Sequence, residues 1–293
     1  MSLVERAIRK LQQSAALAEP ALGPPTEPGG PAERAPPSTA PHGGRASRRA
    51  SALVLDRAAL RNAGLLPPEA EERQLAEQYR RIKRPLIASA FGRGVPAVPN
   101  GHLIVVTSAM AGEGKTFTSV NLALSLALEM DVHTLLVDAD VAKPQISRLL
   151  GIGKDPGLLD ALRDHEVDVE SLVQSTDVEN LEVLPAGTAS REATELLASQ
   201  RMHQVTAALG AHDRQRIVLL DSPPLLQTSE SHALTEAAGQ VLVVVRAEAT
   251  PQPVLLDALK LLEGRGAVSL VLNQTRKSGT AYYYYGYGDE RAN

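Results

Sequence analysis

Short apolar runs alternate with helical patterns from about residue 101 of the chain onward. From Gly101 onward, runs rich in Val, Ile and Leu are bounded by polar residues, and stretches with helical spacing separate most of them. The runs are HLIVVTS, HTLLVDAD, LEVLPAG, RIVLLDS, QVLVVVRAE and VSLVLNQT. Near-continuous apolar strands that alternate with helices are typical of a parallel sheet covered on both faces. The pattern therefore predicts an α/β domain with a mostly parallel sheet.

The first part of the chain has a different pattern. In residues 1–15 apolar positions recur every three to four residues between charged ones, which predicts a short amphipathic helix. This helix is either a frayed end or a docking element for a partner or a membrane surface. Residues 16–50 are rich in Pro, Gly and Ala without periodicity, so we expect a disordered linker. We place the folded domain at residues 51–278, with one helix at about 70–90, and a tail at 279–293.

Composition and charge exclude several classes of protein. The formal net charge of -4 argues against nucleic-acid binding driven by bulk charge. The chain has no cysteine, which removes disulfides, thiolate catalysis and cysteine-ligated zinc. No apolar run reaches the roughly 18 residues that a membrane helix needs, and charges occupy the region where a signal peptide would be apolar. We expect a soluble, intracellular protein whose membrane role, if any, depends on a partner.

A glycine-rich loop follows the first apolar strand. The strand LIVVTS leads into AMAGEGKT and then into a helix, which is the context of a P-loop. Gly112 and Gly114 allow backbone N–H groups to face an anion, Lys115 should reach the β- and γ-phosphates, and Thr116 should bind Mg²⁺. The usual first glycine of the pattern is Ala109 here. A chance Gly-Lys turn is the alternative, which the flanking strand and helix disfavour. The residues expected to bind the nucleotide here are Ala111, Gly112, Glu113, Gly114, Lys115, Thr116 and Phe117.

Aspartates follow two further apolar strands. Asp138 and Asp140 end the strand HTLLVDAD, and Asp221 ends the strand RIVLLDS. Open parallel sheets bind ligands at the carboxyl ends of their strands, and an acid after an apolar strand is the usual Mg²⁺ partner beside a P-loop. Strands often end in Asp for structural reasons, but three such acids around one phosphate loop favour a common site.

The tyrosines are concentrated at the end of the chain. Five of the six lie in AYYYYGYG, and the other is Tyr79. A core would distribute these phenols along strands and helices, so a substrate segment explains the cluster better than a packed or aggregation-prone end. The tail tyrosines are Tyr282, Tyr283, Tyr284, Tyr285 and Tyr287.

Together these segments resemble the bacterial tyrosine kinases, or BY-kinases. SAMAGEGKT, LLVDADVAKP and IVLLDSPP are similar to the Walker A, Walker A′ and Walker B motifs of that family, and the tail is similar to its autophosphorylated end. EQYRRIKRPL and MSLVERAIRKL resemble the branch found with exosortase, PEP-CTERM exopolysaccharide loci. The resemblance covers roughly residues 70–290 and the first dozen.

The resemblance implies a P-loop NTPase fold that uses ATP and Mg²⁺. It implies a catalytic group of Lys115, Asp138, Asp140 and Asp221, and a metal site of Thr116, Asp138 and Asp221. Either Asp138 or Asp140 would take the proton of the attacking phenol. Asn273 matches a position that contacts adenine in related ATPases, although it is also a common type of residue at the end of a strand.

The resemblance also implies a ring-shaped homo-oligomer, such as an octamer, in which one subunit's tail enters the next active site. The family forms this ring through a Glu-x-x-Arg-x-x-Arg helix, and Glu77, Arg80 and Lys83 stand at those positions. Lysine keeps the charge but loses the bidentate geometry of arginine. A solvated charged helix face is the alternative. The arginine usual after Walker A′ is also replaced, by Ala142.

The predicted function is a protein-tyrosine autokinase that phosphorylates its own tail in trans and regulates exopolysaccharide synthesis or export. The expected partners are an inner-membrane chain-length-determinant (polysaccharide co-polymerase) activator and a cognate phosphatase, without nucleic acid. The expected location is the cytoplasm, peripherally at the inner membrane through that activator. One alternative is a ParA/MinD-like positioning ATPase, although Met110 replaces the extra lysine of that class. Another is an ATP-dependent scaffold that a different kinase phosphorylates.

Overall fold

The computed structural model describes residues 52–275. The chain divides into two units, Met1–Leu53 and Val54–Asn293, and the fold given below is that of the second unit. The predicted helix of residues 1–15, the linker of residues 16–50 and the tyrosine tail lie outside the described residues. They, and the predicted domain boundaries, stay predictions.

A seven-stranded sheet forms the centre of the domain, with the order β3-β4-β2-β5-β1-β6-β7. Every neighbouring pair is parallel except β3 and β4. The predicted mostly parallel sheet is confirmed, and each of the six apolar runs contains a strand. The sequence analysis missed β3, which is only two residues long. The strands are β1 (Leu103–Ser108), β2 (His133–Asp138), β3 (Gln174–Ser175), β4 (Leu181–Leu184), β5 (Arg216–Asp221), β6 (Gln240–Arg246) and β7 (Ala267–Asn273).

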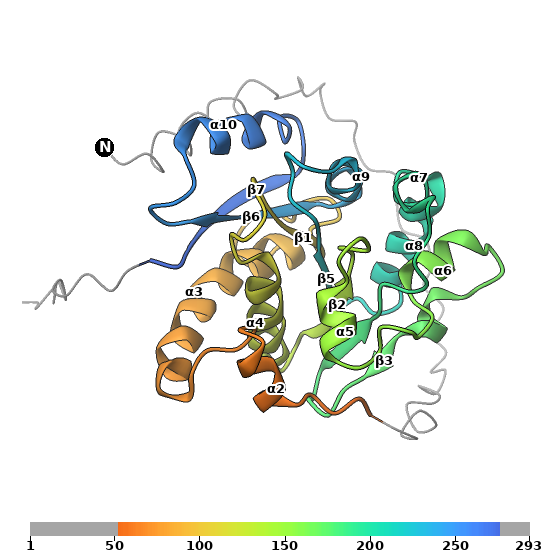
Figure 1. The fold of residues 1–293 in the computed structure, drawn as a ribbon, viewed down its shortest axis with the longest axis horizontal. Helices are drawn as coiled ribbons and strands as arrows, with labels where there is room; N and C mark the ends of the chain where they lie inside the picture. The colour runs from red at the N-terminus through yellow and green to blue at the C-terminus, as the bar shows by residue number, and fades with distance from the viewer. Residues whose placement is uncertain (1–51, 276–293) are drawn as a thin grey trace, which may run out of the picture. The chain divides into compact units, whose positions relative to one another are not determined.

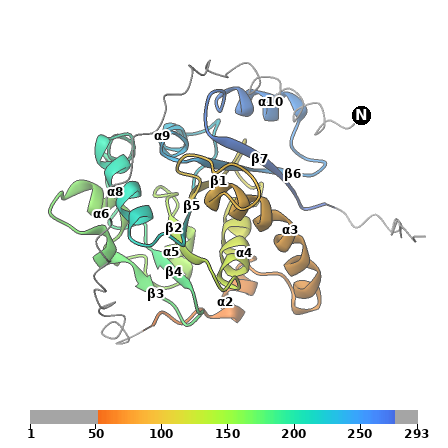
Figure 2. The same cartoon turned by 180° about the vertical axis from the view of Figure 1, so that it is seen from behind.

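Helices cover both faces of the sheet, as predicted. Figures 1 and 2 show α3, α4 and α5 on one face and α8, α9 and α10 on the other. Two short 3₁₀ helices, Glu69–Glu71 and Val169–Leu172, lie between these elements. The α-helices are α2 (Arg57–Asn62), α3 (Glu72–Phe91), α4 (Lys115–Ala127), α5 (Gln145–Leu149), α6 (Leu158–Arg163), α7 (Ala193–Leu197), α8 (Gln200–Ala211), α9 (Ser229–Ala237) and α10 (Gln252–Lys260).

The central strands are buried on both sides. All six residues of β1 and all six of β5 are buried, because each face of the sheet packs against helices. Val105, Val137 and Val218 belong to one apolar cluster that includes residues of α6 and α8. The sheet therefore holds the ends of β1, β2 and β5 in fixed positions. Within residues 52–275, no helix combines the length and apolarity needed to cross a bilayer.

Helix α3 packs along α4, and the position of Lys83 on α3 differs from the one expected from the sequence. Tyr79, Leu86 and Ile87 of α3 are buried. Lys83 is also buried, with 3% of its surface exposed, and does not share the exposed face of Glu77 and Arg80. Its ammonium instead contacts the end of α4. The expectation that Lys83 contributes to an oligomer interface is therefore wrong for this fold, since that side chain is used inside the subunit.

Candidate active site

The glycine-rich loop joins β1 to α4, as the sequence predicts. Gly112 and Gly114 have φ angles of +80° and +96°, in a region where glycine carries no steric cost. Ala109 is buried and is not among the residues with positive φ. Alanine is therefore tolerated at position 109, because the backbone there does not need the freedom of glycine.

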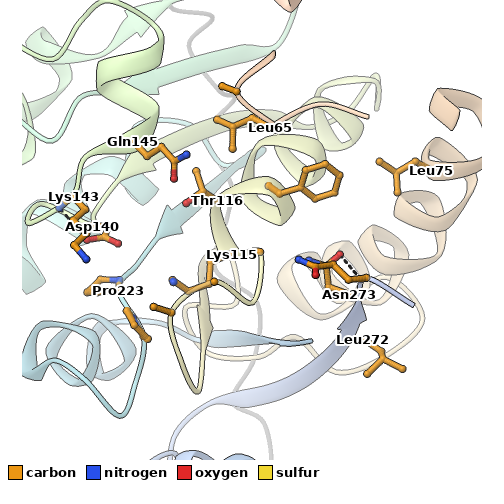
Figure 3. A pocket seen from close by; sticks show the side chains of 18 of the residues that line it. Leu65, Leu75, Lys115, Thr116, Asp140, Lys143, Gln145, Pro223, Leu272 and Asn273 are labelled. Atoms are coloured by element: carbon orange, nitrogen blue, oxygen red, sulfur yellow. Dashed lines mark hydrogen bonds between the residues drawn. The ribbon is translucent and has the colours of Figure 1, made fainter. Parts of the chain in front are cut away.

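A cleft of about 790 Å³ opens over this loop. Its volume is within the range of about 300–1,000 Å³ that is typical of small-molecule sites. Figure 3 shows Asp140 and Lys143 on one side of Lys115, with Leu272 and Asn273 on the other. The cleft thus has a charged side next to the lysine and a side towards β7 where polar and apolar residues are mixed. Other lining residues include Ala111, Gly112, Gly114, Thr116, Phe117, Gln145 and Gln227.

Helix α3 also lines the cleft. Gln74, Leu75 and Gln78 belong to the lining, while Glu77 and Arg80 are exposed and form an ion pair on the same helix. One helix therefore takes part both in the cleft and in an exposed charged surface, which the sequence analysis did not anticipate.

Asp138 and Asp221 lie side by side beneath the cleft. They end β2 and β5 and are direct partners in the parallel register. Both are almost fully buried. Asp138 Oδ2 accepts hydrogen bonds from the backbone N–H and the hydroxyl of Ser147, both at 2.7 Å. Asp221 Oδ1 accepts one from Ser119 Oγ at 2.9 Å. Asp138 Oδ1 is buried and has no hydrogen-bond partner among the described residues.

The environment of this pair disfavours two negative charges. Burial raises the pKa of Asp138 to about 6. Burial and the neighbouring charge of Asp138 together raise the pKa of Asp221 to about 7, against the opposing hydrogen bonds of Thr116 and Ser119. A bound cation would relieve both effects, since an opposite charge favours the ionised carboxylate. The pair with the Thr116 hydroxyl fits such a cation.

The donor set favours magnesium with a phosphate ligand over a metal held by protein alone. Among residues 52–275 there is no group of three or more His, Asp and Glu side chains arranged to hold a metal ion. Mg²⁺ is usually bound through one or two carboxylates together with substrate phosphates and water. The expected metal residues, Thr116, Asp138 and Asp221, suit that mode of binding.

Asp140 lies in a different environment from Asp138. It is half-buried and lines the cleft, and its Oδ1 accepts a hydrogen bond from the backbone N–H of Lys143 at 3.2 Å. Burial raises the pKa of Asp140, while the ammonium groups of Lys115 and Lys143 oppose the increase. Of the two aspartates that follow β2, Asp140 is the one open to a molecule in the cleft.

Asn273 contacts the phosphate loop directly. Its Nδ2 donates to the carbonyl of Glu113 at 2.9 Å, and a Cβ at Gly114 would lie 2.0 Å from the same nitrogen. Glycine at 114 is therefore favoured by its positive φ, and a Cβ there would also have to displace the Asn273 side chain. The expected contact of Asn273 with adenine stays a prediction.

Several supporting residues were missed by the sequence analysis. Ser119 and Ser147 orient the buried carboxylates, and Thr250 contacts Glu113. Ser119 could have been noticed because it lies one turn after Thr116 on the predicted helix. Thr250 gives no such signal, since it is 137 residues from its partner.

A family model described as an AAA domain, AAA_31, matches residues 101–261, which include the phosphate loop and all three aspartates. The chain belongs to this AAA domain family. The matched region is more than half of the chain.

Individual relatives of this AAA domain chain are named tyrosine-protein kinases. YwqD of Bacillus subtilis is 29% identical over 218 residues, covering 73% of this chain and 87% of that protein. The wzc kinase of Salmonella typhimurium is 28% identical over 188 residues, covering 64% of this chain and 26% of that protein. The chain spans about a quarter of the length of wzc and of several other curated relatives.

The fold is also similar to that of a solved tyrosine kinase domain. The kinase domain of the Escherichia coli tyrosine kinase ETK superposes with a TM-score of 0.61 at 25% identity, covering 72% of this chain and 80% of that one. The resemblance to bacterial tyrosine kinases that the motifs predict is therefore confirmed, as is the P-loop fold.

Proposed function

We propose that this chain is a protein-tyrosine autokinase that uses ATP and Mg²⁺ to phosphorylate tyrosines of its own tail. The observation that carries the proposal is the arrangement of Lys115, Thr116 and Asp140 around one cleft with the buried Asp138 and Asp221 beneath it. The similarity to named tyrosine-protein kinases supports it. The five tail tyrosines supply the substrate.

The residues of the loop fit a nucleotide phosphate chain. Gly112 and Gly114 adopt backbone angles that only glycine takes readily, and α4 begins at Lys115, so its N-terminus favours an anion. The Lys115 side chain lines the cleft. Thr116, Asp138 and Asp221 would hold the metal.

The phosphoryl group would pass from ATP to a tyrosine Oη, with release of ADP and loss of the phenol proton, and Mg²⁺ bound at this site would neutralise part of the phosphate charge. Lys115 stabilises negative charge on the transferred group through its ammonium. Ser119 and Ser147 hold the buried carboxylates in place through hydrogen bonds. The glycine loop places its backbone N–H groups around the phosphates, which is a positioning contribution.

Asp140 is the residue that we assign as proton acceptor. A phenol has a pKa of about 10, so a nearby base assists its attack near neutral pH. Asp140 is open to the cleft, whereas Asp138 is fully buried and already accepts two hydrogen bonds. We therefore propose that a carboxylate oxygen of Asp140 accepts the phenol proton and that Asp138 contributes to the metal site.

Phosphorylation in trans requires an oligomer. We propose that the exposed face of α3, with Glu77, Arg80 and Arg84, contributes to the contact between subunits. Arg84 replaces Lys83 in this assignment because its position on the helix is exposed. The ring, the regulation of exopolysaccharide synthesis, the membrane activator and the phosphatase rest on the family resemblance, as does a location at the inner membrane through that activator.

Intact mass spectrometry tests the kinase assignment. The protein would be expressed alone, beside Lys115→Met and a variant with the five tail tyrosines changed to Phe. We expect steps of one phosphate mass in the parent only. Equal phosphorylation of Lys115→Met would show that another kinase modifies the tail, and the scaffold alternative would replace our proposal. If no form carries phosphate, the assay is repeated with the cytoplasmic segments of the membrane activator, and continued absence would contradict autokinase activity.

A further inference from the structure

Glu113 is the one acidic residue of the phosphate loop AMAGEGKT. Its side chain is a carboxylate in a segment that should attract anions, and only 3% of the residue's surface is exposed. It is not among the residues that line the cleft. A buried carboxylate needs hydrogen-bond donors to offset its desolvation. The contacts that it makes therefore indicate what holds it away from the cleft.

Both oxygens of the Glu113 carboxylate are bonded. Oε2 accepts a hydrogen bond from the backbone N–H of Met110 at 2.6 Å, within the same loop. Oε1 accepts one from the hydroxyl of Thr250, which lies between β6 and α10. One side chain thus closes the loop on itself and joins it to a segment that is distant in the sequence.

The segment around Thr250 is itself fixed to the end of β7. The hydroxyl of Thr250 accepts from the backbone N–H of Arg246 at 3.1 Å, and the N–H of Ala247 donates to the carbonyl of Asn273 at 2.9 Å. Asn273 Nδ2 then donates to the carbonyl of Glu113 at 2.9 Å. Figure 3 shows Asn273 at the end of β7. The contacts form a closed circuit that runs from the phosphate loop to the segment after β6, then to the end of β7 and back to the phosphate loop.

We propose that Glu113, Thr250 and Asn273 are positioning residues that hold the phosphate loop in the conformation that binds nucleotide. We call these three residues the loop latch. The inference rests on the proposed binding of nucleotide to this loop. The latch directs the Glu113 carboxylate to Thr250 and keeps its negative charge away from the phosphates. It also fixes the backbone of Glu113, between the two glycines whose N–H groups face the ligand.

Loss of the Thr250 hydroxyl should weaken the latch without altering any residue that lines the cleft. The carboxylate would keep one donor, Met110, and its other oxygen would be buried without a partner. A buried acceptor without a donor is unfavourable, so the loop should rearrange until that oxygen finds water or another donor. The rearranged loop would present its N–H groups less favourably to an anion.

Thr250→Val and Thr250→Ser form a matched pair for the test. Valine keeps the shape of threonine without the hydroxyl, and serine keeps the hydroxyl without the methyl group. Binding of a fluorescent ADP analogue with Mg²⁺ would be measured for both and for the parent, with the melting temperature as a check of folding. We expect affinity at least about fivefold weaker for Thr250→Val and an affinity like that of the parent for Thr250→Ser. Equal affinities for the two variants would overturn the proposal.

Hydrogen exchange gives a second readout that needs no nucleotide. The backbone N–H groups of residues 109–114 should exchange faster in Thr250→Val than in Thr250→Ser, because the latch restrains them. If exchange is equal, the latch is wrong whatever the nucleotide result. If exchange differs but the parent binds no nucleotide, the latch restrains the loop and the proposed function fails instead. Thr250→Ala repeats the test if the valine variant does not fold.

Discussion

The ammonium of Lys83 lies 2.7 Å from the carboxylate of Glu129, just beyond the end of α4. It also donates to the carbonyl of Ser125 in the last turn of that helix. A cation at this end is favourable because the carbonyl groups there carry partial negative charge. Lys83 therefore joins α3 to the helix that begins at the phosphate loop.

Lys83→Met should lower the free energy of unfolding by about 1–3 kcal/mol, because the Ser125 carbonyl would lose its buried donor. Methionine retains most of the apolar stem, so the loss would reflect the ammonium. Lys260→Met is the matched control, since the ion pair of Lys260 with Asp257 is exposed and exposed pairs contribute little to stability. Urea denaturation of both variants measures the difference, and equal losses would contradict the assigned role.

Two glycines of the phosphate loop should differ in their tolerance of alanine. Both have positive φ, so each substitution strains the backbone by roughly 1–2 kcal/mol. A Cβ at Gly112 meets no atom within 4 Å, whereas one at Gly114 would lie 2.0 Å from Asn273 Nδ2. We expect Gly114→Ala to weaken nucleotide binding at least tenfold more than Gly112→Ala, and titration with labelled ADP would measure both. The reverse order would show that the contact of Asn273 with the loop is unimportant.

Asp221 should make stability depend on pH in an unusual direction. Its pKa rises from 3.8 to about 7 on folding, so between those values the folded chain keeps a proton that the unfolded chain has lost. The free energy of unfolding therefore falls as pH rises through this range. Asparagine does not titrate, so the free energy of unfolding of Asp221→Asn does not fall in this way. Relative to the parent, this variant should therefore become more stable as pH rises from 5 to 8. One pKa unit corresponds to about 1.4 kcal/mol, so we expect a gain of at least about 1 kcal/mol.

Urea denaturation at the two pH values, without nucleotide or Mg²⁺, provides the measurement. Asp160→Asn is the control, since hydrogen bonds from Thr188 and Gly157 outweigh burial and lower the pKa of Asp160. The contribution of Asp160 to stability is lost only at pH values below the ordinary pKa of an aspartate. The stability of Asp160→Asn relative to the parent should therefore be the same at pH 5 and pH 8. A relative gain for Asp221→Asn that is no larger than that of the control would contradict the raised pKa.

Lys143 should influence the lower pH limit of kinase activity. Its ammonium opposes the increase in the pKa of Asp140, so Lys143→Met should raise that pKa further. If Asp140 accepts the phenol proton, the acidic limb of the activity profile moves slightly to higher pH, while Lys143→Arg leaves it unchanged. The exposed Lys154 provides the control, Lys154→Met. If the acidic limb lies at the same pH in all three variants, Lys143 does not influence the group that accepts the phenol proton.

The exposed face of α3 should control the oligomeric state. Arg80→Glu with Arg84→Glu reverses two charges on that face without changing a buried residue. We expect the mass measured by light scattering to fall towards that of the monomer, with little change in melting temperature. Arg214→Glu, at another exposed position, should leave the mass unchanged. An unchanged mass for the double variant would place the subunit contact elsewhere.

Much of the fold follows from local pattern. The strands β1, β2, β5 and β6 are nearly continuous apolar runs, which is the signature of strands buried on both faces. The phosphate loop was recognisable because its glycines and lysine stand at fixed spacing between a strand and a helix. By contrast, β3 has two residues, too few for any periodicity.

The supporting contacts of the site could not be predicted in the same way. Glu113 finds Thr250 across 137 positions of the sequence, and no local pattern encodes such a pairing. Lys83 was misassigned because lysine is usually exposed and the spacing from Glu77 and Arg80 suggested one face. The position of Lys83 on α3 turns its side chain towards α4, where the ammonium finds Ser125 and Glu129.

The burial of Tyr79 between helices has an optical consequence. It is the only tyrosine within residues 52–275, and the chain contains no tryptophan. Burial raises the pKa of its phenol, so the group stays protonated well above neutral pH. In the variant whose five tail tyrosines are Phe, Tyr79 is the one remaining tyrosine, so the tyrosine emission of the protein comes from it alone. Its intensity and anisotropy would report the packing of α3 on α4 without any added label.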